Sequence, residues 1–179
     1  MDPLTHTCSG ILLGQALRPC EAVHRRTLIV LAIAAFAPDL DAASYLWGAD
    51  VYGRLHHLYT HTVVGVVLLA AVLAGVERAW LRGMSFGRLF AWSLAGCSLH
   101  VLGDVVAVWP LRILWPWSDR DFVLRWTGDF DLVVLTVVGL ATGLTAVDTL
   151  RGRERWIIGT AVLVVVAYFV WMPGAAGLQ

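Results

Sequence analysis

His100 and Asp104 lie near the end of a long apolar run, where an ionisable side chain is costly. If the run is helical, the two residues are four positions apart and share one face. An imidazole and a carboxylate at this spacing can bind one metal ion together, or they can pair with each other as a buried structural unit. The pair alone leaves both interpretations open, so the other motifs must decide.

Two carboxylates, Asp39 and Asp41, follow another apolar run, which Pro38 is expected to stop because proline disfavours helix at the preceding residue. In an extended segment, side chains at i and i+2 point the same way. Two hard oxygen donors in that arrangement suit a divalent cation, or a bridge between two cations. The alternative is an ordinary helix end with both carboxylates in water.

Three histidines, His56, His57 and His61, fall within six residues directly before a strongly apolar segment. Helical geometry would pair His57 with His61, whereas His56 could fold back from a loop, so the choice between His56 and His57 as a ligand stays open. Thr60 is the expected N-cap of the helix that follows. Three histidines at a membrane boundary favour metal binding over a surface role.

Further polar residues are expected at the same end of the molecule as His100, Asp104 and the three histidines. His6, in the opening segment, is expected to be a ligand, and either Asp2 or Thr5 is expected to cap the first helix. Asp131 precedes a later apolar run. It either caps that helix or adds a last carboxylate to the site.

The elements that must position these side chains are apolar helices. The chain has 179 residues, of which 59% are hydrophobic and 15% charged, and this is too apolar for a soluble domain of that size. The expected fold class is an all-α, polytopic membrane bundle, with residues 1–179 forming one domain. Zero net charge gives no indication of a nucleic-acid partner. Four full spans are expected at 61–81, 86–109, 131–150 and 156–172, after an N-terminal helical hairpin made by 4–17 and 27–37.

The arginines indicate an orientation. There is no lysine, and of the thirteen arginines nine fall in the turns after the first, third and fifth apolar helices, against four at the opposite end. The nine are Arg18, Arg25, Arg26, Arg78, Arg82, Arg88, Arg151, Arg153 and Arg155, and the four are Arg54, Arg112, Arg120 and Arg125. We therefore expect these turns in the cytoplasm and the His/Asp end on the extracytoplasmic side.

Taken in order, the motifs resemble those of the YdjM-type membrane-bound metal-dependent hydrolases, also described as LexA-binding, inner-membrane-associated hydrolases. That family shows an opening M-D-x-x-T-H, then A-P-D-x-D, H-R-G-x-T-H-S, H-x-x-x-D and P-F-S, and a late acidic residue. The matching segments here are 1–6, 37–41, 56–62, 100–104, 116–118 and 130–131. The resemblance implies an inner-membrane location and a metal site made from His6, Asp39, Asp41, His56, His61, His100 and Asp104.

This chain departs from the family pattern within the histidine motif. His57 stands where the family has arginine, Leu58 where it has glycine, and Thr62 where it has serine. Loss of an arginine changes how an anionic group such as phosphate is held, because guanidinium binds such groups through two parallel hydrogen bonds. The departure therefore concerns the substrate more than the metal.

Three functions are weighed on this basis. The first is a hydrolase of a phosphoester or another lipid-linked ester at the bilayer, in which a divalent metal, with zinc favoured by His and Asp ligands, activates water. Asp41 or Asp131 would then serve as the general base. The second is a divalent-metal transporter or sensor, which should carry further polar groups through the membrane. The third is a structural or partner-binding membrane protein with a vestigial site.

The expected orientation can be tested by labelling cysteines from outside intact cells. With the three native cysteines replaced by alanine, a single cysteine in the segment 119–125 should react with a membrane-impermeant thiol reagent. A single cysteine in the segment 151–155 should react only after the membrane is permeabilised. Labelling of the 151–155 position alone in intact cells would reverse the orientation.

Overall fold

The computed structural model describes residues 1–17, 21–147 and 150–171. Within these residues the chain is helical, with no strand beyond one isolated bridge between Leu111 and Phe122. The elements are α1 Pro3–Leu17, α2 Glu21–Phe36, the 3-10 helix η1 Ala37–Trp47, α3 Ala49–Leu55, α4 Val63–Trp80, α5 Phe86–Val106, α6 Leu132–Thr145 and α7 Glu154–Trp171. Arg18, Asp148 and Met172, which the expected turn and spans included, lie outside the described residues.

Four helical segments are long and apolar enough to cross a membrane: His24–Trp47, Val63–Trp80, Phe86–Val106 and Glu154–Trp171. The expected all-α membrane bundle is therefore confirmed. The identity of the spans differs from the sequence prediction in two places, which are the N-terminal hairpin and the expected span at 131–150.

The first difference is that Pro38 does not stop the second apolar run. It occupies the first turn of η1, where a backbone N–H has no partner within the helix and the ring of proline is tolerated. The helix therefore changes type at Ala37 and continues to Trp47, giving a span of 24 residues. Asp39 and Asp41 consequently lie on a helix of about three residues per turn, and not on an extended segment.

The second difference concerns the expected span at 131–150. The helix there, α6, has only 14 residues, which at 1.5 Å per residue is about 21 Å and shorter than a hydrocarbon core of about 30 Å. The helix begins after its N-cap, Asp131, and reaches its C-cap at Ala146. The apolar run extends past that point in the sequence, but the helix does not.

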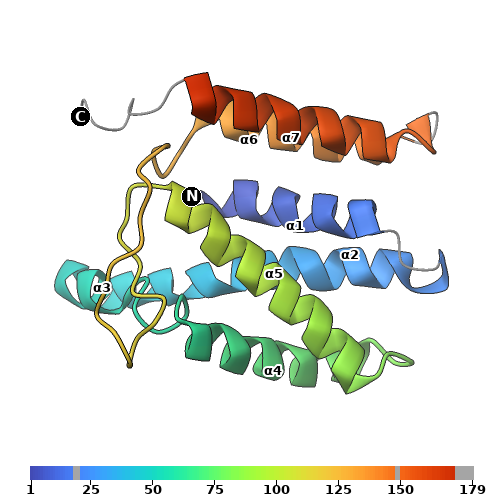
Figure 1. Ribbon diagram of the computed structural model, residues 1–179. Coiled ribbons are helices and arrows are strands. Elements are labelled where there is room, and N and C mark those ends of the chain that lie inside the picture. Colours follow the sequence, from blue (N-terminus) through green and yellow to red (C-terminus); the bar gives the residue numbers. More distant parts are fainter. Residues whose placement is uncertain (18–20, 148–149, 172–179) are drawn as a thin grey trace.

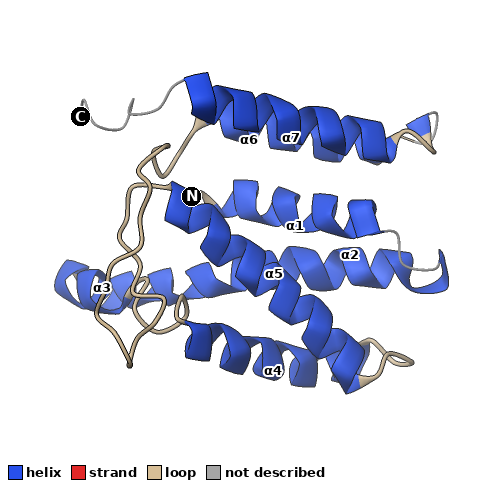
Figure 2. Cartoon of the chain, viewed as in Figure 1, coloured by secondary structure: helices blue, strands red, loops and turns tan. Residues whose placement is uncertain are grey.

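The helices are arranged so that their connections fall at two ends of the bundle (Figure 1). The N-terminus, α3 and the loop 107–131 lie at one end, and the turn between α4 and α5 lies at the other. Figure 2 shows the loop 107–131 as a long non-helical segment between α5 and α6. The expected His/Asp residues are therefore gathered at the end that carries α3 and this loop.

Small residues allow α2 to lie close against α1 and α5, and this closeness brings the site residues within reach of one another. A Cβ atom placed on Gly10 of α1 would lie 2.4 Å from the carbonyl oxygen of Leu31. A Cβ atom on Gly96 of α5 would lie 2.6 Å from Cβ of Ala34. Such contacts are typical of membrane helices, where small residues let backbones approach.

We predict that Gly10→Ala destabilises the bundle by about 1–3 kcal/mol, because the added methyl group meets a backbone oxygen that cannot move away. The measurement is thermal unfolding of the detergent-purified protein. Gly75→Ala is the matched control, since nothing lies within 4 Å of a Cβ atom on Gly75 of α4. Equal melting temperatures for the two variants would show that α1 and α2 are not so closely packed.

Candidate metal centre

Asp104 lies at the centre of a buried cluster of imidazole rings from α1, α5 and the turn before α4. Its Oδ2 atom is 3.0 Å from Nε2 of His100 and 3.2 Å from Nε2 of His61. Its Oδ1 atom is 3.0 Å from Nε2 of His6 and also accepts a hydrogen bond from the amino group of Met1. His6 stacks on His100, with ring centroids 3.8 Å apart. The expected helical pair of His100 and Asp104 is thus joined by histidines from two other elements.

The hydrogen bonds of His100 and His61 leave the inward nitrogen of each neutral ring without a proton. Nδ1 of His100 donates to the carbonyl oxygen of Ala35 at 2.7 Å. The Thr60 hydroxyl donates to Asp41 at 2.6 Å, so its oxygen is free to accept from Nδ1 of His61 at 2.8 Å. The two Nε2 atoms then face each other at 3.0 Å. Two lone pairs at that distance require a cation or a proton between them.

The carboxylates of the cluster point to the same need for positive charge. Oδ2 of Asp39 and Oδ2 of Asp104 are buried and receive no hydrogen bond of acceptable geometry, which is costly for a carboxylate. Burial alone would lower the pKa of His61, but its contacts with Asp104 and Asp41 outweigh burial and raise that pKa. The site therefore attracts a proton or a metal ion, and nitrogen and oxygen donors of this kind suit a divalent metal.

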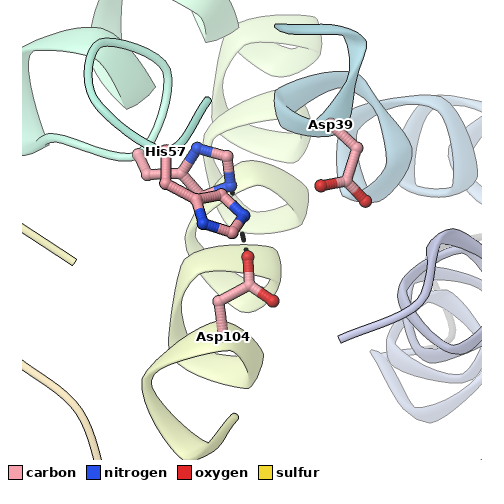
Figure 3. A group of neighbouring side chains, drawn as sticks. Asp39, His57 and Asp104 are labelled. Atoms are coloured by element: carbon pink, nitrogen blue, oxygen red, sulfur yellow. Dashed lines mark ion pairs between the residues drawn. The ribbon is translucent and has the colours of Figure 1, made fainter. Parts of the chain in front are cut away.

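Two sets of side chains are close enough to hold a metal ion. The first consists of Asp39, His57, His61 and Asp104, and the second of His6, Asp39 and His100; within each set the donor atoms all lie within 4.8 Å of one another. Asp39 belongs to both sets, and it also lies 3.5 Å from Nε2 of His100. Figure 3 shows Asp39, His57 and Asp104 converging from η1, the turn before α4, and α5.

Five of the residues expected as ligands are therefore brought together, namely His6, Asp39, His61, His100 and Asp104. Asp41 and His56 belong to neither set. Oδ1 of Asp41 accepts from Nδ1 of His56 at 2.6 Å, and its Oδ2 accepts from the backbone N–H of His57 at 3.0 Å and from Thr60. On a 3-10 helix, positions i and i+2 point in different directions, so Asp39 reaches the cluster while Asp41 turns to the histidine segment.

His57 belongs to the first ligand set. The sequence alone did not decide whether His57 or His56 is the ligand. His57 lies in a turn with φ of +66°, a conformation that is uncommon for a residue with a side chain. Burial, together with the neighbouring His61 and His56, lowers the pKa of His57 to about 3, so its ring is neutral and offers a lone pair. The spacing of His57 and His61 had indicated the pair, but through a helix that the structure does not contain at these residues.

Helix capping accounts for Asp2 and Thr62. Asp2 accepts from the backbone N–H of Thr5 at 2.9 Å, as expected of a cap. Thr62, not the expected Thr60, is the N-cap of α4, and it accepts from the N–H of Gly65 at 2.9 Å. Thr60 is instead committed to Asp41.

Asp131 is the N-cap of α6, which was one of the two roles expected for it. It accepts from the N–H groups of Val133 and Val134, from the Thr127 hydroxyl at 2.6 Å and from the Tyr168 hydroxyl at 3.0 Å. Burial alone would raise its pKa, but these hydrogen bonds lower it. Among the described residues, Asp131 belongs to neither ligand set, and the structure does not bring it to the cluster.

A cavity of about 470 Å³ gives the cluster an opening. Asp39 and His57, two members of the first ligand set, line it together with Tyr52, Trp109 and Phe130. The cavity is within the size range of small-molecule sites and combines aromatic walls with a few polar groups. If the cluster holds a metal ion, the ion can be reached from this cavity.

We predict that Asp41→Asn weakens metal binding by roughly 10- to 100-fold, because Asp41 holds the segment that carries His57 and His61. Metal affinity is measured by titrating the metal-free protein in detergent. Asp50→Asn is the control, since Asp50 is exposed on α3 at the same end of the molecule. Unchanged affinity would remove the positioning role, and complete loss of binding would make Asp41 a ligand.

Comparisons with known proteins agree with the resemblance seen in the motifs. A family model described as YdjM inner membrane protein matches residues 1–176. The chain is also similar to the uncharacterized protein YfhP of Bacillus subtilis (strain 168), with 27% identity over 137 residues. The match covers 73% of this chain and 42% of that protein, so the chain spans less than half of the relative's length. No solved structure matches the chain. The family model covers nearly the whole chain, which also has four apolar helices of spanning length and a His/Asp cluster that could hold a metal ion. The chain therefore belongs to the YdjM family of inner membrane proteins.

Proposed function

We propose that this protein is an integral-membrane hydrolase that depends on a divalent metal and acts on a phosphoester or another lipid-linked ester. The observation that carries the proposal is the pair of Nε2 atoms of His61 and His100, which lie 3.0 Å apart and within 3.0–3.2 Å of the buried Oδ2 atom of Asp104. Such a concentration of donor atoms at the membrane boundary is costly unless it binds something. The adjoining cavity gives a reactant access.

Zinc is the metal that best suits these donors, because imidazole nitrogen and carboxylate oxygen are its usual ligands outside cysteine sites. Asp39 belongs to both ligand sets, so one oxygen of its carboxylate would help to hold a metal ion in either set. When bound, such ions supply an activated water at neutral pH and stabilise the negative charge that develops on the ester. The hydrogen bonds from His100 to Ala35 and from His61 to Thr60 hold the rings in the orientation needed for binding.

We propose Asp39 as the general base, in place of Asp41 or Asp131. Both oxygens of Asp41 accept hydrogen bonds from the histidine segment, and Asp131 is engaged at the start of α6. Asp39 lines the cavity and has an oxygen without a partner, so it is placed to accept a proton from a reactant there. Asp41 then acts as a positioning residue.

One observation favours a second candidate, a divalent-metal transporter. Glu77 of α4 is 1% exposed within a spanning helix, accepts from the Ser93 hydroxyl at 3.0 Å and has one unpartnered oxygen. A buried acidic residue of this kind marks an ion or proton pathway in many membrane proteins. Ser93, Cys97 and His100 are buried along the same helix, α5, and could connect Glu77 with the metal centre.

We predict that Asp104→Asn removes bound metal and phosphoester hydrolysis together. The amide keeps the size of the side chain and one acceptor oxygen, but it removes the negative charge on which three histidine contacts converge. The measurements are metal content, melting temperature and hydrolysis of bis(p-nitrophenyl) phosphate by one detergent-purified preparation with added Zn²⁺.

His24→Ala is the control for this prediction, since His24 is bonded to Gln15 at the other end of α1 and α2. It should keep both metal and activity. Retention of metal by Asp104→Asn with a lower melting temperature would make His100 and Asp104 a structural pair. Metal-loaded wild-type protein that hydrolyses no phosphoester, but carries Zn²⁺ into proteoliposomes in a manner that Glu77→Gln abolishes, would favour the transporter.

A further inference from the structure

An apolar groove of about 420 Å³ runs between α1 and α7 beside the metal centre. Leu12, Leu13 and Ala16 of α1 form one wall, and α7 forms the opposite wall. Ser9 is the one polar side chain among the residues that line the groove; all the others are aliphatic or aromatic. A groove with this lining offers no partners to water, so an apolar occupant is favoured.

The groove opens toward the lipid phase. Val162 and Val166 line it from α7, and their side chains remain 55% and 51% exposed. Both belong to the span Glu154–Trp171, so the opening lies at membrane depth. Hydrocarbon can therefore enter the groove sideways from the bilayer.

One end of the groove lies near the ligand sets along α1 and α5. Ser9 lies three positions after His6, so the two side chains share a face of α1 at a separation of about 4.5 Å along the helix. Leu99, which lines the groove from α5, directly precedes His100. From Ser9 the groove follows α1 as far as Ala16, which is about 10 Å away along the axis.

The lining and the position of the groove favour a hydrocarbon chain as the occupant. Its walls are aliphatic or aromatic apart from Ser9, and it opens between residues of a spanning helix, where lipid chains surround the protein. A chain that moves from the bilayer into the groove gains little free energy, because both surroundings are apolar. The benefit is alignment, since a held chain fixes the depth at which its polar end lies.

We propose that this groove holds the hydrocarbon chain of the substrate, which is therefore a membrane lipid whose phosphate-type head group lies at the metal centre. The placement of the head group rests on the proposed function, whereas the binding of the chain does not. The groove extends away from His6 and His100, so a lipid lying in it has its chain within the membrane and its polar end beside the ligand sets.

The test uses dodecyl phosphate with a photoactivatable diazirine near the end of its chain, added to the detergent-purified protein. Crosslinked residues are located by mass spectrometry. We expect saturable adducts on groove residues such as Leu13 and Val166, displaced by unlabelled dodecyl phosphate. Val162→Trp, which fills the groove, should lower this labelling about tenfold.

Leu163→Trp is the matched control, because Leu163 is the next residue of α7, is 70% exposed and does not line the groove. It should leave labelling unchanged. Val166→Trp provides a second groove-filling variant at another exposed position, should Val162→Trp not fold. Adducts that spread evenly over the lipid-facing surfaces of α4 and α7 without saturation would overturn the proposal, as would equal labelling of the Val162→Trp and Leu163→Trp variants.

The result for the groove is distinguishable from the result for the hydrolase. In the Asp104→Asn protein, groove adducts should persist, because no groove contact involves the ligands. Saturable groove labelling of a wild-type protein that hydrolyses no phosphoester would support a lipid-chain site and contradict the hydrolase. Hydrolysis of a soluble phosphoester that is unaffected by dodecyl phosphate, with no saturable groove labelling, would support the hydrolase and overturn the groove.

Discussion

The negative charge of Asp104, buried at the membrane end of α5, is the constraint on which the rest of the site depends. A carboxylate there must be neutralised, and three imidazole groups from α1, α5 and the turn before α4 approach it within 3.0–3.2 Å. As neutral rings, His100 and His61 cannot donate to it, because their Nδ1 protons are already committed to backbone and hydroxyl oxygens. Positive charge at the centre, as a proton or a metal ion, completes the arrangement.

The close approach of helices makes this convergence possible. The histidines come from segments about forty or more residues apart in the chain, and they meet because glycines on α1 and α5 allow both helices to lie against α2. α2 itself contributes the Ala35 carbonyl that orients His100, and its continuation, η1, contributes Asp39. The same helix therefore supplies the packing surface, the orientation of one ring and the carboxylate that the two ligand sets share.

Two hollows matter for the cluster: the cavity lined by Asp39 and His57, and the apolar groove between α1 and α7. The cavity beside Asp39 and His57 is open at the end of the bundle, whereas the groove between α1 and α7 lies at membrane depth. A lipid with its chain in the groove and its head group beside the cluster would use both features. Asp41 contributes without entering either ligand set, since its hydrogen bonds hold the turn that carries His57 and His61. His57 places a nitrogen donor next to the cavity.

The sequence by itself determined the membrane class and the helical bundle, because hydrophobicity acts locally, and the i, i+4 spacing indicated His100 with Asp104. The ordered motifs added His6, Asp39 and His61, which the structure places near that pair. The sequence could not separate Asp39 from Asp41, since their directions depend on Pro38 beginning a 3-10 helix and not ending the run. The inclusion of His57 depends on a turn with positive φ, which spacing does not reveal. The role of Asp131 was decided by Thr127 and Tyr168, which contact it only in the folded chain. In each case the tertiary structure decided which oxygen or nitrogen atoms were already satisfied by neighbours, and therefore which remained available for a ligand.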